Sequence, residues 1–419
     1  MSETLATQEL SRRDRYVVLV AAFLGWLLAG CVMASGLIAG RPALKGLGLV
    51  AEDEVGLWFS GLLCAFLLGA AVGGLVLGWV GDRFGRTRGA GISMLIFAAG
   101  MALTPLAATP TQLLILRFLA CLGVGGMWPN GVALVSEAWA SVSRPLLAGV
   151  IGASANVGFV VMGLIARNYA VIPESWGWFF VLVSVPAAIV GAVTLVAVPE
   201  SPLWRAQKAE PTETKAAPVA EVFGPTLIRR TLIGICLGTI PLLGNWGATT
   251  WVTPWADQVG GDKDVGLKGT IEALRSVGSV IGSLMGGWLA SLFGRRTLYF
   301  VISLLAVLAS GYLFRSLTPA DPAFKYWVVV VGFLGVVYFG WLPLYLPELF
   351  PTRVRSTGSG VSFNFGRILA IPGVFLGGKL LEHFDGDYAR AGQTMSLIFA
   401  LGMVVICFAP DTSRARMED

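Results

Sequence analysis

Charged side chains are scarce in this sequence of 419 residues, because Asp, Glu, Lys and Arg make up only 13% of it. Soluble domains carry roughly 25%. Hydrophobic residues make up 55%, and the mean hydropathy is +0.75. A chain so poor in charge cannot cover a soluble surface, so we expect it to lie in a lipid bilayer. The net charge of +5 comes from basic residues in short loops between apolar runs, which argues against a nucleic-acid partner.

Sites that depend on histidine or on paired cysteines are missing as well. His383 is the only histidine, and one histidine cannot build a histidine-based metal site, so we interpret it as a surface residue. The five cysteines lie inside apolar segments and are interpreted as small packing residues. They are Cys31, Cys64, Cys121, Cys236 and Cys407. Because no nucleophile–base set or metal cluster is visible, we predict a protein that is not an enzyme and has no cofactor and no metal.

Twelve apolar segments follow one another along the chain, each long enough to cross a bilayer, for which about twenty residues suffice. The longest hydrophilic stretch, at about 202–224, divides six segments from six. The segments are 16–40, 55–80, 89–108, 111–139, 145–168, 176–198, 230–256, 266–292, 297–315, 325–350, 356–379 and 390–409. The predicted domains are an N-terminal six-helix bundle at 1–198, a linker at 199–229 and a C-terminal six-helix bundle at 230–419.

Three short patterns occur twice, separated by about half the chain length. The Glu137/Arg144 pair recurs as Glu348/Arg355, 211 residues later (137 to 348). Pro199–Ser201 recurs as Pro410–Thr412, also 211 residues later (199 to 410). Gly85-Arg86 recurs as Gly294-Arg295, 209 residues later (85 to 294). Such a repeat predicts an internally duplicated protein. Six spans per half is an even number, so both halves enter the membrane in the same direction. We therefore expect an all-α fold of two parallel bundles, related by a pseudo-two-fold axis along the membrane normal, with a midplane site between them.

Lysine and arginine are about twice as frequent on the side of the two termini as on the opposite side. This asymmetry predicts that both termini are cytoplasmic. We expect a multi-pass protein of the plasma membrane (in a bacterium, the inner membrane) that works as a monomer.

The loop between segments two and three carries the most specific motif. Residues Gly78 to Arg88 read Gly-x-x-x-Asp-Arg-x-Gly-Arg-Thr-Arg. Together with twelve spans, this loop resembles the signature loop of the major facilitator superfamily. In that family Asp82 would face the N-terminal end of span eleven, which begins near Ser356 and whose helix dipole favours an anion. In the second copy of the motif, Ser291 stands in the place of the acid.

The repeated Glu/Arg pairs resemble cytoplasmic motifs of the sugar-porter and metabolite-symporter branches, as does the Pro-Glu-Ser-Pro-Leu-Trp-Arg segment at 199–205. In those relatives carboxylates and arginines join across the two halves when the inner side is shut. The resemblance implies a cytoplasmic gate, although a solvated inner rim is the alternative. The gate residues would be Asp82, Arg83, Arg86, Glu137, Arg144, Glu200, Arg295, Glu348 and Arg355.

Two departures from the sugar porters bear on function. Val32 stands where those symporters carry an acid in span one, although Arg117, the partner of that acid, is present. The usual proton switch is therefore missing. In span seven the paired glutamines of sugar porters are absent, and the segment Trp246–Pro254 looks more like the aromatic-acid and organic-ion branches.

Arg367 is the strongest candidate for binding a substrate. It follows Arg355 by twelve residues, and at about 1.5 Å per residue it lies roughly 18 Å deep in the membrane. A mid-membrane arginine is costly unless it serves a function. Its counterpart in the first half is Asn156, and Asn364 lies nearby. We predict that Arg367 and Asn364 meet an anionic or hydrogen-bond-accepting group. A structural arginine that caps backbone carbonyls is the alternative.

Aromatic and amide residues of spans four, seven and ten complete the predicted site, because such side chains suit a flat or hydroxylated solute; simple packing is the alternative. They are Trp128, Asn130, Asn245, Trp246, Trp251, Tyr338 and Trp341. Glu272 and Arg275 lie three residues apart on one face of span eight. They either neutralise each other, or Glu272 carries a coupling proton.

We therefore predict a carrier that moves a small polar organic solute, with an organic anion favoured, across the membrane by alternating access. Its partners would be that substrate and the bilayer, and coupling to protons stays open. The alternatives are a facilitator or proton symporter of a neutral sugar or polyol, a ligand sensor that does not transport, and a drug efflux carrier.

Overall fold

Twelve helices of the computed structural model are long and apolar enough to cross a membrane. The structure describes residues 10–139, 144–202, 204–205, 219–351 and 354–410. The predicted all-α fold of twelve spans in two bundles of six is confirmed. The predicted linker at 199–229 lies partly outside this description, because residues 203 and 206–218 are not described.

The first bundle consists of six helices. They are α1 (Arg12–Gly46), α2 (Val55–Phe84), α3 (Arg86–Leu103), α4 (Pro110–Ala138), α5 (Arg144–Asn168) and α6 (Trp178–Ala197). The Thr109 side chain accepts a hydrogen bond from the Gln112 backbone at 3.2 Å, and Pro110 follows at the first helical position. These are favoured residues at the start of a helix. The sharp turn from α2 to α3 needs Gly85, whose φ is +121°, a backbone region that glycine adopts without strain.

The second bundle repeats this plan with more interruptions. Its spans are α9 with α10 (Ile228–Leu243, Val252–Gly260), α11 (Leu267–Phe293), α12 (Arg295–Ser316), α13 with α14 (Pro322–Val337, Leu342–Glu348), α15 (Arg355–His383) and α16 with α17 (Tyr388–Ser396, Ile398–Phe408). A short helix, α8 (Val219–Val222), precedes them. The seventh span is broken by a π turn at Gly244–Ala248 and a 3-10 turn at Thr249–Trp251. Non-helical backbone at membrane depth is tolerated where it borders a cavity or is buried in protein.

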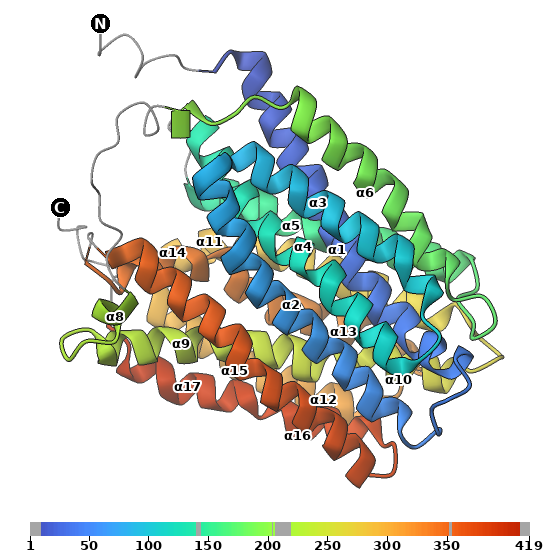
Figure 1. The fold of residues 1–419 in the computed structure, drawn as a ribbon. Helices are drawn as coiled ribbons and strands as arrows, with labels where there is room; N and C mark the ends of the chain where they lie inside the picture. Colours follow the sequence, from blue (N-terminus) through green and yellow to red (C-terminus); the bar gives the residue numbers. More distant parts are fainter. Residues whose placement is uncertain (1–9, 140–143, 203, 206–218, 352–353, 411–419) are drawn as a thin grey trace, which may run out of the picture.

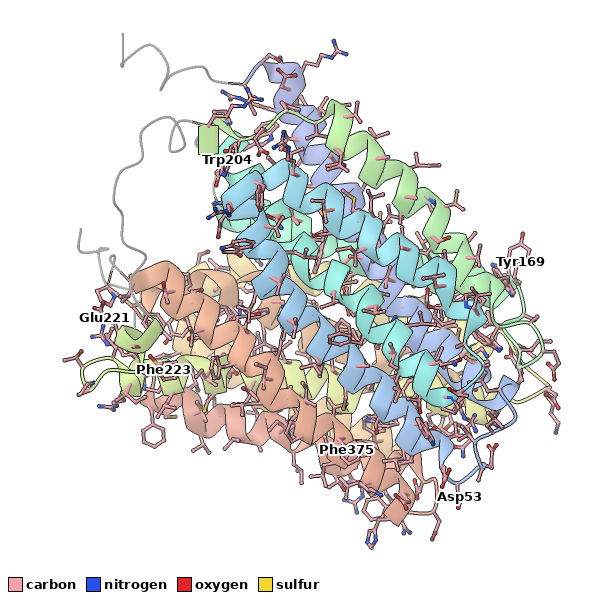
Figure 2. The ribbon with its side chains drawn as sticks, viewed as in Figure 1. Asp53, Tyr169, Trp204, Glu221, Phe223 and Phe375 are labelled. Carbon is pink, nitrogen blue, oxygen red and sulfur yellow. The ribbon has the colours of Figure 1, made fainter. Side chains whose placement is uncertain are left out.

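The two bundles meet along two helix pairs, α2 with α15 and α5 with α11. Figure 1 shows α2 and α15 side by side, and shows the start of α1 and the end of α17 at one end of the molecule. We call this end the terminal end and the other the distal end. In Figure 2, Trp204 and Glu221 lie at the terminal end, and Tyr169 and Asp53 at the distal end. Close glycine contacts, such as Gly163 of α5 beside the Ala273 backbone of α11, allow the helices to approach closely.

Candidate functional site

A cavity with a volume of about 130 Å³ lies between the two bundles, and residues of both line it. Most of its walls are apolar, and its polar side chains are few. Apart from the tryptophans, the polar side chains on its walls are Asn156, Asn245, Arg275, Ser283 and Arg367. A concave, mainly apolar site with several aromatic rings and a few polar groups is typical of small-molecule binding.

Aromatic rings form the walls of this cavity. The rings are Trp26, Phe66, Trp128 and Phe159 of the first bundle and Trp246, Phe339 and Phe363 of the second. The Phe66 and Trp246 rings, from opposite bundles, lie 4.4 Å apart between centroids, and Trp26 lies 4.9 Å from Trp128. A flat, partly apolar solute suits such walls better than a solute that is polar on all sides.

Five of the ten predicted substrate-binding residues line the cavity. These five are Trp128, Asn156, Asn245, Trp246 and Arg367. Asn364 lines a groove that adjoins the cavity and also borders Trp128 and Arg367. This groove includes Pro347 and Ser359, which lie near the ends of α14 and α15 at the terminal end, so the site continues in that direction.

The other four predicted residues lie in helix packing instead. Asn130 donates to the Leu77 and Gly126 carbonyls at 2.9 and 2.8 Å. Trp251 donates to the Gly247 carbonyl at 2.6 Å, and Tyr338 and Trp341 both pack on the Tyr299 ring. Sequence position gives the depth of a residue along its helix but not the direction in which its side chain points, and these four side chains point away from the cavity.

Arg367 is a cation without a carboxylate partner in the described part of the chain. Its Nη1 donates to the Ala70 carbonyl of the other bundle at 3.3 Å and contacts Asn364 Oδ1 at 3.5 Å. Its Cζ lies 4.9 Å from the centroid of the Phe363 ring. Arg367 therefore contacts a backbone carbonyl, as the alternative role predicts, and also lies on the cavity wall. Most of the hydrogen-bonding capacity of this guanidinium is left for another acceptor.

Glu272 and Arg275 form an ion pair in which Arg275 lines the cavity and Glu272 lies behind it. The carboxylate of Glu272 has no exposed surface, and Arg275 is 3% exposed. Arg275 donates through Nη2 at 2.5 Å and through Nε at 3.3 Å. The hydroxyls of Thr253 and Ser276 also donate to Glu272, at 2.5 and 3.1 Å. Four donors surround the carboxylate, as an ionised carboxylate requires.

Arg117 is buried beside Phe66 of the cavity wall, and its partners are backbone carbonyls. It is 4% exposed and donates to the carbonyls of Val32 and Met33 at 2.7 and 3.2 Å. Its Cζ lies 5.9 Å from the Phe66 ring. Backbone carbonyls solvate this charge but do not neutralise it, so the surroundings of the cavity are electropositive.

Comparison with known proteins identifies the family. Residues 16–374 match the Major Facilitator Superfamily. This chain belongs to that superfamily. It is therefore a membrane carrier and not an enzyme. The cis,cis-muconate transport protein of Acinetobacter baylyi is 27% identical over 322 residues, which cover 74% of this chain and 75% of that protein. The gentisate transporter of Corynebacterium glutamicum is 26% identical over 349 residues, covering 81% and 76%.

The solved structures that resemble this superfamily member share its fold. The inward open conformation of the xylose transporter XylE from E. coli aligns with a TM-score of 0.69, covering 96% of this chain and 98% of that chain at 16% sequence identity. A likeness at this identity concerns the fold alone.

At the terminal end of this superfamily fold, the predicted gate residues form the same contact in each bundle. Arg86 Nε lies 3.6 Å from Glu137 Oε1, and Arg295 Nη2 lies 3.1 Å from Glu348 Oε1. Arg86 also pairs with Asp82. The Arg86–Glu137 pair and the Arg295–Glu348 pair each join two helices of the same bundle. The motif that is repeated in the sequence therefore forms the same Arg–Glu contact in both bundles. The side chains of Arg144 and Arg355 lie outside the described residues.

Two other gate candidates have local contacts. The Glu200 carboxylate accepts hydrogen bonds from the Thr87 backbone amide at 3.1 and 3.3 Å, so it caps the first turn of α3. The guanidinium of Arg83 lies 5.7 Å from the Trp79 ring. The hydroxyl of Ser201 donates to Glu137, which ties the segment after α6 to α4.

A charged cluster at the distal end was not predicted from the sequence. Asp257 of α10 accepts from Arg41 of α1 at 3.2 Å and from Lys268 of α11 at 2.7 Å. Lys268 also donates to the Val171 carbonyl at 2.7 Å, and Arg41 pairs with Glu52 at 3.0 Å. Arg41–Asp257 and Lys268–Val171 connect the two bundles. A signal was available, because Arg41 and Asp257 each stand directly beside a predicted span.

Proposed function

We propose that this carrier transports a small, flat organic carboxylate and that Arg367 binds the carboxylate group. The observation that carries the proposal is an arginine on the wall of an aromatic cavity, with no carboxylate partner in the described residues. An uncompensated cation in a low-dielectric site favours an anionic solute. The second uncompensated cation, Arg117, adds to this preference.

The printed names of two relatives support the same class of substrate. The muconate transport protein and the gentisate transporter are named for carboxylates that are flat and conjugated. The cavity of this chain offers aromatic walls for such a plane and a guanidinium for its charge. A neutral sugar would instead need many hydrogen-bonding side chains, and Asn156 and Asn245 are the amides that line this cavity.

We propose that the terminal end faces the cytoplasm of a cell whose plasma membrane holds the carrier as a monomer, as the distribution of basic residues indicates. The halves 1–198 and 230–419 would then move as units joined by the segment 199–229. Ion pairs cross between the bundles at the distal end, while the groove beside the cavity leads toward the terminal end. Both features suit an inward-facing state of an alternating-access cycle.

The proposal is tested by Arg367→Gln, which removes the charge and keeps hydrogen-bonding capacity. Arg315→Gln, at an exposed position of α12, is the matched control. Calorimetric titration of the purified protein with cis,cis-muconate, gentisate and xylose is the measurement. We expect Arg367→Gln to weaken carboxylate binding by about tenfold or more, and Arg315→Gln to leave it unchanged. Carboxylate affinity that is equal in both variants and the parent would contradict the proposal.

A further inference from the structure

The cavity has two arginines on its walls, and they differ in their partners. Arg367 has no carboxylate partner in the described residues, whereas Arg275 is held by Glu272 through two hydrogen bonds. Counting these three groups, the cavity carries one net positive charge as described. If Glu272 takes up a proton, Arg275 loses its counter-charge and the net charge becomes two. The number of carboxylates that the cavity can neutralise therefore depends on one proton.

We infer that the cavity takes a dicarboxylate, with one carboxylate on Arg367 and the other on Arg275 once Glu272 is protonated. This inference rests on the proposed function and names its substrate class. The step is an exchange of partners: Glu272 gains a proton from solvent, and Arg275 donates its two hydrogen bonds to the substrate instead. When the substrate leaves, Glu272 releases the proton and accepts from Arg275 again.

The groups around Glu272 restrict this exchange of partners to the Glu272–Arg275 pair. The helices packed on α11 in this region are α5, α10 and α13. The α10 helix brings the Thr253 hydroxyl to Glu272, and α13 brings Gly332, whose added Cβ would lie 2.0 Å from the Arg275 carbonyl. From α5 comes the Phe159 ring, whose centroid lies 5.7 Å from Arg275 Cζ.

Other charged groups that face α11 are already paired. They are Asp257 of α10, Arg41 of α1 and Lys268 of α11 itself, which form the distal cluster. In the described part of the chain, no charged side chain other than Arg275 is within salt-bridge distance of Glu272. A proton on Glu272 therefore changes the partner of Arg275 and of no other cation.

The Phe159 ring makes the exchange possible without moving Arg275 far. The guanidinium already lies over a ring that lines the cavity, and a cation over an aromatic face is held there by the ring quadrupole. A substrate carboxylate in the cavity then competes with Glu272 for the same donors. Because the two carboxylates carry like charges, they cannot both be ionised at one guanidinium without mutual repulsion.

The test uses pairs of probes that differ by one carboxylate, bound to the purified full-length protein. trans,trans-Muconate is compared with sorbate, and terephthalate with 4-methylbenzoate, because in each pair a methyl group replaces one carboxylate. Affinities are measured at about pH 6 and about pH 8, where all four probes are ionised, since carboxyl groups titrate near pH 4. We expect the diacids to bind about tenfold or more tightly than the monoacids at the lower pH. This advantage should shrink at the higher pH.

Two variants separate charge exchange from a structural role. Glu272→Gln should keep the strong binding of diacids at both pH values, because Arg275 is then free throughout. The double variant Glu272→Gln with Arg275→Gln removes both charges of this pair, so that Arg367 is the one cation left on the cavity wall in the described residues, and it should bind diacids only as well as monoacids. Opposite effects of these variants on the ratio of diacid affinity to monoacid affinity are not expected from a pair that only stabilises the fold.

The outcomes also separate this inference from the proposed function. Equal affinity for monoacid and diacid in the parent protein, or full diacid affinity in the double variant, overturns the dicarboxylate inference while carboxylate transport stands. If the parent protein binds none of the four probes, the proposed function itself fails, and this inference fails with it.

Discussion

Single residues set the charge in and around this cavity through the partners of three arginines, of which Arg117 and Arg275 are buried and Arg367 is partly buried. Arg275 has a carboxylate partner, Arg367 has a carbonyl and an amide, and Arg117 has two carbonyls. Each charge is costly inside a membrane unless it is solvated by such groups. The positions that hold these guanidiniums in place should therefore be sensitive to small changes.

Gly36→Ala should destabilise the protein by displacing Arg117. A Cβ at Gly36 would lie 2.4 Å from both Cζ and Nη2 of Arg117, and the guanidinium is held against Val32 and Met33. Overpacking of this kind costs about 1–3 kcal/mol, which would lower the apparent Tm in detergent. Gly311→Ala, where nothing lies within 4 Å of the added Cβ, is the control. Equal melting of the two variants would show that Arg117 can move freely.

Glu200→Ala should loosen the start of α3. The carboxylate accepts from the Thr87 amide at 3.1 and 3.3 Å, and an anionic cap at a helix N-terminus contributes about 1 kcal/mol. Glu382→Ala is the matched control, because that glutamate forms an exposed pair with Lys379, and such pairs contribute little. Hydrogen exchange of the α3 amides, measured by mass spectrometry, should rise in the first variant only. No rise in α3 would show that Glu200 does not stabilise the start of this helix.

Elements of this fold pack through glycines at helix crossings. At the crossing of α11 and α13, a Cβ at Gly332 would lie 2.0 Å from the Arg275 carbonyl, and one at Gly278 would lie 2.0 Å from the Val329 carbonyl. Backbone atoms cannot move aside as flexible side chains can. This crossing therefore fixes the position of α11 and, with it, the position of Arg275 on the cavity wall.

Gly332→Ala should lower both stability and ligand affinity, because α11 must shift away from α13. We expect a loss of about 1–3 kcal/mol, whereas Gly311→Ala in α12 should be neutral or slightly stabilising, since alanine is the better helix former. Thermal unfolding and carboxylate titration of both variants are the measurements. A Gly332→Ala protein that melts and binds like the parent would contradict the close crossing.

At the scale of the whole molecule, the distal cluster holds the two bundles together at one end. Asp257 contacts Arg41 of the first bundle, and their side chains are 19% and 8% exposed. A partly buried charge pair that forms in one conformation and breaks in the other stabilises the first conformation relative to the second. The terminal pairs, Arg86–Glu137 and Arg295–Glu348, stay within one bundle.

Asp257→Asn should shift the carrier toward a state that is open at the distal end. The amide keeps the size of the side chain but loses its charge to Arg41 and Lys268. Spin labels at Leu49 and Val259, both exposed and in different bundles, should report longer distances. Asp387→Asn is the control, because Asp387 pairs with Arg390 of α16, the helix that begins directly after it, and does not contact the first bundle through this pair. An unchanged distance distribution in Asp257→Asn would show that the cluster does not latch the bundles.

The sequence by itself determined the number of spans, the duplication and the depth of the charged residues. Hydropathy is a local property that the thickness of the bilayer sets directly, so twelve apolar segments could be counted without a structure. The depth of Arg367 along its span follows from helix rise alone. The internal repeat in turn predicts that Arg86 is equivalent to Arg295 and that Glu137 is equivalent to Glu348.

The tertiary structure alone decided which of these residues face the cavity and which partner each charge has. Helix rotation depends on packing against segments far away in the chain, as Arg41 and Asp257 show across 216 residues. This is why Asn130 and Trp251, at suitable depth, lie in helix packing, while the unpredicted Phe159 lines the cavity and contacts Arg275. The depth of a residue depends on its position along its own helix, whereas the direction of its side chain depends on how that helix packs against other helices.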